Sequence, residues 1–528
     1  MKKITLILAF AAQSLFVFAQ KQAPDNWFNL DPKLNKVNGV STERAYLELL
    51  KGKGAEKVIV AVIDGGTEVL HEDLKRVIWV NRGEIANNGI DDDKNGYVDD
   101  VNGWNFIGGP DINVDEDNLE VTRLYKQLKP RYEKVDTNSL DGAEKDNYAF
   151  FIKVRNAYNK GFKEYAMYNN IYTALENGVV SLTNNLKKDS LSMAEFKAYK
   201  PIDMNEAMAH NSIAKTFEAS KANYVVISKF SKGLSEAKSQ ISKAVDYQYN
   251  LDFDSRTIVG DNYENPHERY YGNNKLGEPN GEHGTHVAGI IAADRTNGGG
   301  INGVSDQTEI MVLRVVPDGD ERDKDVANAI RYAVDNGAKI INMSFGKPFS
   351  PYKNVVDEAV IYAKEKDVLL VHAAGNDNKN LEVDDNFPND KIEGYDASNW
   401  LEVGASSWKA KKLITAPFSN YGKTTVDVFA PGVDIKSCVP KSSYAVYSGT
   451  SMASPVTAGV AAVLRSYYPQ LTAAEVKKII MDSSIKIKGK VLIPGTKKKV
   501  KLSEICISGG IVNLYQAVLL AEKLMASK

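Results

Sequence analysis

Continuous apolar runs recur along the chain and end in small or polar residues. They cover residues 57–63, 310–316, 339–343, 368–372, 401–405 and 426–430. Apolar runs without polar alternation are typical of strands buried on both faces, as in parallel sheets. Helix-like spacing at residues 325–336 and 354–365 lies between some of the runs. Strands that alternate with helices predict right-handed βαβ units, and therefore an α/β fold with one mainly parallel, doubly wound sheet.

The stretch from residue 119 to 250 interrupts this rhythm. It has only four glycines in 132 residues, and it shows helix-like spacing at residues 147–168 and 231–249. Since glycine marks turns and breaks, its scarcity favours long helices. We therefore predict an inserted, mostly α-helical subdomain. Two interpretations of it stay open: a solvated bundle packed on the side of the main domain, and a lid or partner-docking arm.

The first residues predict an exported protein. Lys2 and Lys3 precede a short apolar segment that closes at the small residue Ala19. A basic start, an apolar core and a small residue at the end are typical of a secretory signal peptide, here cleaved after Ala19. A membrane anchor is the weaker interpretation, because Gln13 and Ser14 interrupt a stretch that is already short for a span. We expect a secreted or periplasmic protein with no membrane span in the mature chain.

Composition narrows the class of protein but does not identify its function. The 528 residues carry 66 basic and 68 acidic side chains, and 43% are hydrophobic, as in ordinary globular proteins. The formal net charge of −2 gives no global electrostatic reason to bind nucleic acid.

The chain has two cysteines, Cys438 and Cys506, which form either a disulfide or two buried thiols. The oligomeric state stays open.

Four polar residues stand where apolar segments end or begin. Asp64 follows the first apolar run, and Asn376 follows the run at residues 368–372. His283 opens the segment HGTHVAG, and Ser451 lies in GTSMASP at the start of a small-residue helix. Ligands of doubly wound sheets bind at the carboxyl ends of the strands. We therefore expect these four residues to lie close together.

These residue types together supply the parts of an acyl-transfer site. A serine hydroxyl is a poor nucleophile until a base such as His283 takes its proton. A carboxylate such as Asp64 fixes the tautomer of the base, and Asn376 and the backbone N–H of Ser451 can stabilise an oxyanion. Pro455, four residues after Ser451, is expected in the first turn of its helix, where a missing N–H costs little.

Three of these segments resemble those of a known family. VIDG at residues 62–65, HGTHVAG at 283–289 and GTSMASP at 449–455, in this order, are similar to the motifs of subtilisin-like serine proteases, the subtilase or peptidase S8 family. The similarity covers roughly residues 58–105 and 247–520. It implies a subtilisin-like three-layer fold and an endopeptidase that acts on polypeptides through a Ser-His-Asp triad and an acyl-enzyme. No cofactor is required for that chemistry.

The same resemblance assigns the substrate-binding residues. The segment Ser344, Phe345 and Gly346 is similar to the one that pairs with extended substrate backbone in the family. Ala374 and Gly375 are expected to line the pocket for the side chain that precedes the cleaved bond. The small residues there predict a roomy, apolar pocket.

Some features of the sequence allow other interpretations. His286 lies three residues after His283, but the HExxH pattern of metalloproteases is absent, so His286 is expected to be structural. The chain also departs from the family pattern, with Gly65 after the aspartate and Val456 after the proline.

Two other functions stay open: a scaffold of the same fold whose insertion occludes the cleft, and a processing protease of narrow specificity.

An acidic loop predicts either a calcium site or a turn. Asp91, Asp93 and Asn95 stand at the first, third and fifth places of an EF-hand-like loop. Residue 102 is asparagine and not the bidentate glutamate, so the loop is not a standard EF-hand. A structural calcium ion and a turn of Asx motifs are both open. The glycine-rich loop 297–303 is a second candidate.

The predicted domain plan follows from these segments. Residues 1–19 are the signal peptide, 20–56 a leader, 57–118 and 251–528 the two parts of the catalytic domain, and 119–250 the helical insertion. The leader is too short for the folding-assisting propeptide that is usual in the family.

Overall fold

The computed structural model describes residues 23–279, 281–409 and 411–528. The predicted signal peptide lies outside these residues. The described chain forms two compact units: Ala23–Glu120 together with Asp254–Lys528, and the intervening Val121–Phe253. The smaller unit corresponds to the predicted insertion.

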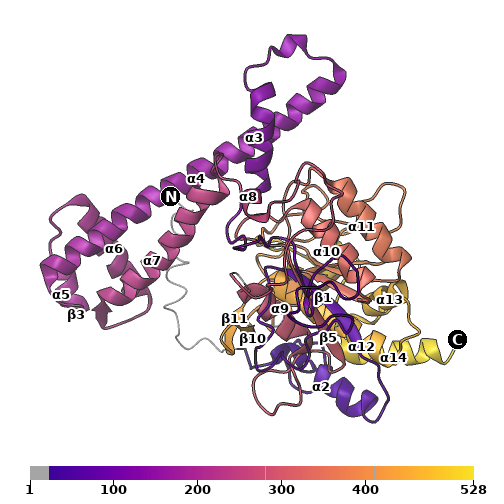
Figure 1. Cartoon of the computed structure of the whole chain (residues 1–528). Coiled ribbons are helices and arrows are strands. Elements are labelled where there is room, and N and C mark those ends of the chain that lie inside the picture. Colours follow the sequence, from indigo (N-terminus) through magenta and orange to yellow (C-terminus); the bar gives the residue numbers. More distant parts are fainter. Residues whose placement is uncertain (1–22, 280, 410) are drawn as a thin grey trace. The chain divides into compact units, whose positions relative to one another are not determined.

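A nine-stranded sheet forms the centre of the larger unit (Figure 1). Its strands, in order across the sheet, are β12 (Ile485–Lys486), β15 (Gly510–Ile511), β9 (Val428–Pro431), β8 (Trp400–Ser406), β7 (Leu369–Ala373), β6 (Ile340–Met343), β1 (Val58–Asp64), β5 (Thr308–Arg314) and β2 (Gly103–Asn105). All neighbours pair in parallel except β12 and β15. The six apolar runs form six of these strands, so the predicted α/β fold is confirmed.

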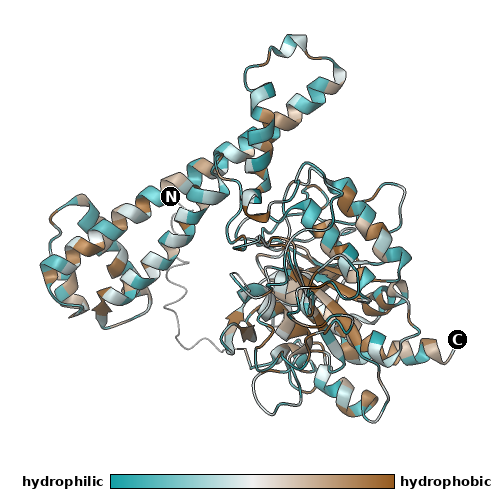
Figure 2. Ribbon diagram, in the orientation of Figure 1, coloured by the Kyte–Doolittle hydropathy of each residue, from teal (hydrophilic) through white to brown (hydrophobic). Residues whose placement is uncertain are grey.

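Helices cover both faces of this sheet. They are α9 (Glu282–Ala292) and α12 (Thr450–Tyr467) on one face, and α10 (Asp323–Asp335) and α11 (Lys353–Glu365) on the other. Alternate side chains of a strand point to opposite faces. In β1, Val60 and Val62 therefore pack in the core with α9 and α12, whereas Ala61 and Ile63 pack with α10 and α11. Figure 2 shows the resulting hydrophobic sheet strands in brown.

The remaining elements of the larger unit lie around this three-layer core. They are α2 (Thr42–Ala45), α8 (Arg256–Val259), α13 (Ala473–Ser483), α14 (Leu514–Met525), the strand pairs β10 (Ile435–Val439) with β11 (Ser443–Tyr447) and β13 (Lys490–Leu492) with β14 (Lys499–Lys501), and the short turns η1 (Trp27–Asn29), η2 (Tyr46–Leu50), η5 (Lys411–Leu413) and η6 (Leu502–Glu504). The predicted leader packs into this unit, because Trp27 and Phe28 are buried in its core. Cys438 and Cys506 are both buried and unpaired, so the disulfide alternative is wrong.

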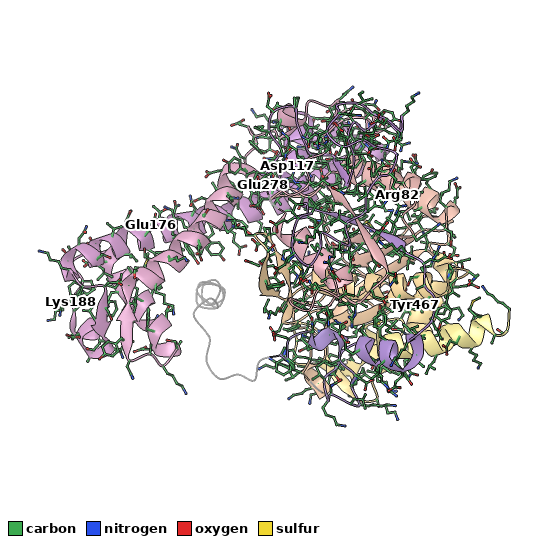
Figure 3. All side chains as sticks on the ribbon, turned by 60° about the horizontal axis from the view of Figure 1, so that its bottom comes forward. Arg82, Asp117, Glu176, Lys188, Glu278 and Tyr467 are labelled. Atoms are coloured by element: carbon green, nitrogen blue, oxygen red, sulfur yellow. The ribbon has the colours of Figure 1, made fainter. Side chains whose placement is uncertain are left out.

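The insertion is mostly helical, as predicted. It contains α3 (Glu120–Tyr132), η3 (Thr137–Ser139), α4 (Gly142–Leu186), α5 (Met193–Ala198), α6 (Met204–Ala219), α7 (Ile227–Lys243), η4 (Ala244–Gln248) and the strand pair β3 (Ser190–Ser192) with β4 (Tyr224–Val226). Side-chain caps begin three of the helices: Asp141 for α4, Ser192 for α5 and Asp203 for α6. The unit has its own hydrophobic core, which includes Phe196 and Phe230. Figure 3 shows Glu176 and Lys188 on this unit.

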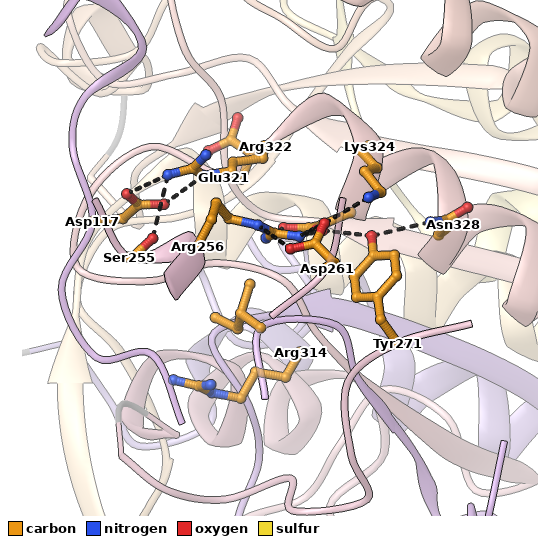
Figure 4. Close-up of polar contacts among 12 residues, drawn as sticks. Asp117, Ser255, Arg256, Asp261, Tyr271, Arg314, Glu321, Arg322, Lys324 and Asn328 are labelled. Carbon is orange, nitrogen blue, oxygen red and sulfur yellow. Dashed lines mark hydrogen bonds and ion pairs between the residues drawn. The ribbon is translucent and has the colours of Figure 1, made fainter. Parts of the chain in front are cut away.

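Buried ion pairs flank both ends of the insertion (Figure 4). Before it, Asp117 accepts two hydrogen bonds from Arg322, at 2.8 and 2.9 Å. After it, Arg256 donates to Asp325 at 2.8 and 3.2 Å. Arg322 directly precedes α10 and Asp325 lies in its first turn, so the segments of the larger unit before and after the insertion both bind at the start of α10. Among the helices of the described residues, none has both the length and the apolar character needed to cross a bilayer.

Candidate active site

Asp64 and His283 form a hydrogen-bonded pair at the carboxyl end of the sheet. Asp64 ends β1 and His283 lies in the first turn of α9, so the fold joins residues that are 219 positions apart. The Nδ1 atom of His283 is 2.8 and 3.0 Å from the two Asp64 oxygens. Because the carboxylate only accepts, Nδ1 carries the proton and Nε2 is left with a lone pair. The side chain of His283 is 42% exposed and that of Asp64 only 4%.

The environment makes His283 a stronger base than a free imidazole. Burial disfavours its charged form, but the charge of Asp64 and the hydrogen bond to it outweigh this effect. Together with a smaller contribution from Glu282, they raise the pKa of His283 above its ordinary value. His283 therefore gains a proton more readily than an isolated histidine does.

His286, one turn of helix further on, has a different environment. It is fully buried, its Nε2 lies 3.2 Å from the carbonyl oxygen of Ala445, and its ring stacks on Tyr447. Burial lowers the pKa of His286 to about 3, so its ring stays neutral. This position inside the protein is the one expected for a structural residue.

Ser451 lies at the amino-terminal end of α12 against Ser344. The Oγ of Ser451 donates to the carbonyl oxygen of Ser344 at 3.1 Å, and the Oγ of Ser344 donates to the carbonyl oxygen of Ser451 at 3.0 Å. Ser344 in turn lines the same pocket as Asp64 and His283. The hydroxyl of Ser451 thus points to Ser344 rather than to His283 in this structure. Catalytic hydrogen bonds are often incomplete without substrate.

Pro455 explains why Ser344 can hold Ser451 in this way. It is the sixth residue of α12 and not in the first turn, so that expectation is wrong. Because proline has no N–H, the carbonyl of Ser451, four residues earlier, has no donor within the helix. The Ser344 hydroxyl supplies that donor, and the Nδ2 of Asn342 donates to Ser344 at 3.0 Å. Ser454 bonds to the same Asn342 at 2.8 Å, as expected of a packing serine.

The Nδ2 of Asn376 and the backbone nitrogen of Ser451 both lie beside Gly449. The Oδ1 of Asn376 accepts from the backbone N–H and the hydroxyl of Thr450, at 2.8 and 3.0 Å. The amide orientation is fixed by these bonds, so Nδ2 is left to donate elsewhere. A Cβ built on Gly449 would lie 3.6 Å from both the Nδ2 of Asn376 and the backbone nitrogen of Ser451. The absence of a side chain at Gly449 keeps this space open.

A pocket of about 500 Å³ adjoins the pair. It is lined by Asp64, Gly65, Glu282, His283, Val316, Pro317, Asp318, Ser344, Phe345 and Tyr447. Of the predicted substrate-binding residues it contains Ser344 and Phe345, whereas Gly346, Ala374 and Gly375 are not part of its lining. Ala374 is fully buried, and its carbonyl accepts from Asn386 and Asn420.

Glu282 and Tyr447 belong to this site without any signal in the sequence. The Tyr447 hydroxyl donates to the Glu282 carboxylate from 165 residues away. Tyr447 lies on β11, and Glu282 precedes His283 directly. Neither residue belongs to a motif, because their contact exists only after β11 has packed beside α9.

The acidic loop brings three carboxylates together. Glu84, Asp93 and Asp100 have oxygens within 4.8 Å of one another, a geometry that could hold a cation. Asp91 and Asn95 instead accept hydrogen bonds from backbone N–H groups of the turn, at 2.8 to 3.0 Å. Of the three predicted ligands, Asp93 alone belongs to the cluster. Calcium binding stays a prediction.

Comparisons with known proteins agree on one family. A family model described as the subtilase family matches residues 55–504. A thermophilic serine proteinase of Bacillus sp. (strain AK1) is 39% identical over 251 residues, which are 47% of this chain and 56% of that protein. The thermitase of Thermoactinomyces vulgaris is 39% identical over 210 residues, which are 39% of this chain and 68% of thermitase.

The share of a relative's own length that matches this chain varies widely. The cell wall-associated protease of Bacillus subtilis (strain 168) is 37% identical over 232 residues, or 43% of this chain and 23% of that protein. The chain thus spans about half or less of the length of two of these three relatives. A solved structure of the prenylagaramide maturation protease is 28% identical, with a TM-score of 0.37 over 46% of this chain and 82% of that one.

Proposed function

Because the chain belongs to the subtilase family, we propose that it is a serine endopeptidase that cleaves polypeptides through an acyl-enzyme. The observation that carries this proposal is the geometry around one point. Among the described residues His283 has a carboxylate partner at 2.8 Å on Nδ1, and the Nδ2 of Asn376 and the backbone nitrogen of Ser451 both lie beside Gly449. Asp64, His283 and Ser451 form the proposed triad, and Asn376 is the proposed oxyanion donor.

The proposed reaction has two halves. Ser451 Oγ attacks the carbonyl carbon of the substrate while Nε2 of His283 takes the hydroxyl proton, and Asp64 stabilises the resulting imidazolium. The oxyanion accepts hydrogen bonds from Asn376 Nδ2 and the Ser451 N–H. The C–N bond breaks as His283 returns its proton to the leaving amine. Water then attacks the acyl-enzyme by the same route, which releases the acid and restores Ser451.

Substrate and location follow from the family and the sequence. Ser344, Phe345 and Gly346 pair with extended substrate backbone, and Ala374 and Gly375 shape the pocket for the side chain before the cut. The enzyme is exported to the cell exterior or the periplasm. A structural calcium ion at the acidic loop and partner docking by the insertion are further parts of the proposal.

Labelling with a fluorophosphonate tests the proposal directly. The reagent forms a stable adduct only with a serine that an adjacent base activates, so we expect one adduct on Ser451 in the full-length protein. A digest of a peptide library then separates a general endopeptidase from a narrow processing protease. No adduct on Ser451, with the protein folded, would favour the occluded scaffold.

Replacing Asn376 by alanine should lower kcat by about 10² to 10³, with little change in KM. That magnitude is the one known for the corresponding donor of subtilisin. The reason is the loss of a donor that acts mainly on the oxyanion of the transition state. Steady-state kinetics with a peptide substrate would measure it.

The matched control is Asn376→Asp. Aspartate keeps an oxygen for the N–H of Thr450 and so keeps the end of α12 in place, but it offers no donor. If both variants lose kcat, the donor is responsible. Activity retained in Asn376→Asp would show instead that Asn376 serves only to cap the helix.

Replacing Glu282 by glutamine should shift the pH profile. Glu282 raises the pKa of His283, and the reaction needs His283 neutral. Loss of this charge lowers the pKa of His283, so the acid limb of kcat/KM should move to lower pH while the plateau at higher pH is unchanged. Glutamine still accepts from Tyr447. The shift should shrink in high salt, and a profile that stays in place at low salt would contradict the prediction.

A further inference from the structure

A second histidine–carboxylate pair lies inside the sheet beneath the proposed substrate-pairing segment. His372 on β7 is fully buried, and Glu402 on β8 is only 5% exposed. The two residues are direct partners in the parallel register of these strands. The Nδ1 of His372 lies 2.9 and 3.1 Å from the Glu402 oxygens. The neighbours of both residues along their strands are apolar, so this pair is an exception in the core.

The other side of the ring contacts the backbone of Phe345. The Nε2 of His372 is 2.8 Å from the carbonyl oxygen of Phe345. A carbonyl only accepts, so Nε2 carries a proton and donates it. One further proton is shared between Nδ1 and the Glu402 carboxylate, and the Glu402 charge keeps the pKa of His372 raised against the effect of burial. The Nε2 of His372 therefore carries a proton, whereas the proposed base His283 needs an Nε2 without one.

The carboxylate has its own supports. The indole N–H of Trp400 donates to Glu402 at 2.9 Å, and the backbone N–H of Glu402 donates to Asp427 at 2.8 Å. Burying such a pair brings little net stability, because the cost of removing both groups from water offsets their attraction. A gain in stability therefore does not explain why this pair is buried. The pair has another effect: it fixes the direction in which the Nε2–H of His372 donates.

We propose that His372 and Glu402 are positioning residues that hold the segment Ser344–Phe345–Gly346 in the shape that pairs with substrate. This inference rests on the proposed function. Two successive carbonyls of the segment accept hydrogen bonds: that of Ser344 from Ser451, and that of Phe345 from His372. Because carbonyls alternate along an extended chain, holding Phe345 inward directs the backbone groups of Gly346 toward the substrate.

Two amide substitutions at His372 separate the two bonds. Glutamine places its nitrogen where Nε2 lies and keeps the donor to Phe345, whereas asparagine reaches only the position of Nδ1 and keeps the contact with Glu402. We expect His372→Asn to raise KM for a peptide with four residues before the cleaved bond by about ten- to a hundredfold. His372→Gln should stay near the wild-type KM. Labelling by a small fluorophosphonate, which does not reach the segment, should proceed at the wild-type rate in both.

The outcomes are distinguishable. Equal KM values for the Asn and Gln variants, or a fluorophosphonate rate that falls as much as peptide cleavage, would overturn the positioning role. If His372→Asn does not fold, Glu402→Met is the second variant. It removes the partner that holds Nδ1 of His372, so it should raise KM in the same direction as His372→Asn, and an unchanged KM would overturn the inference. A folded wild-type chain that neither labels nor cleaves peptides would overturn the proposed function, and this inference with it.

Discussion

Ser451→Ala should lose nearly all peptidase activity while it keeps its fold. The variant lacks the nucleophile, and a fall in kcat on the order of 10⁶ is the loss known for the nucleophile of subtilisin. Only one hydrogen bond of the Ser451 side chain disappears, the one to Ser344, so the free energy of unfolding should change by about 1 kcal/mol or less. Kinetics with a peptide substrate, fluorophosphonate labelling and circular dichroism would measure these effects.

Ser454→Ala is the matched control for this substitution. Ser454 lies on the same helix, but its hydroxyl is buried and bonds to Asn342 and to the carbonyl of Val371. The control should keep both labelling and turnover and lose about 1 kcal/mol of stability. Undiminished cleavage by Ser451→Ala, or inactivity of a folded Ser454→Ala, would contradict the assignment of the nucleophile.

Arg256→Met should destabilise the larger unit by about 3–5 kcal/mol, because it leaves buried carboxylates without their cation. Arg256 is only 6% exposed. It binds Asp325 through two nitrogens and donates to Asp261 at 2.7 Å (Figure 4). Burial already raises the pKa of Asp325 with Arg256 in place. Urea unfolding in the Ser451→Ala background, where self-digestion cannot occur, would measure the loss.

An exposed ion pair provides the comparison. Lys478 and Asp482 are 2.8 Å apart on α13, but their side chains are 76% and 52% exposed. Lys478→Met should change the free energy of unfolding by less than about 0.5 kcal/mol, because water and side-chain entropy offset exposed pairs. If Arg256→Met costs no more than Lys478→Met, the buried ion pairs of Arg256 do not stabilise the larger unit.

Much of the fold was predictable because its signals are local. Apolar runs that continue without polar residues identify strands with both faces covered, and all six predicted runs are strands of the sheet. The insertion was predictable for a similar reason, since glycine-poor stretches with helical spacing became α4 and α7. The exact boundaries and the role of that insertion are not marked by a local pattern in the sequence. The prediction for Pro455 was wrong because α12 begins at Thr450, which makes Pro455 its sixth residue.

The sequence by itself determined the α/β class and the helical insertion, and it predicted that Asp64, His283, Asn376 and Ser451 lie close together, because strand ends and helix starts locate such residues in a sheet of this type. Only the tertiary structure decided which way each polar atom points. The hydroxyl of Ser451 lies on Ser344, the ring of His283 faces Asp64, and that of His372 faces Glu402 and Phe345. Hydrogen-bond direction depends on partners that are distant in sequence, so it is settled by packing and not by local pattern.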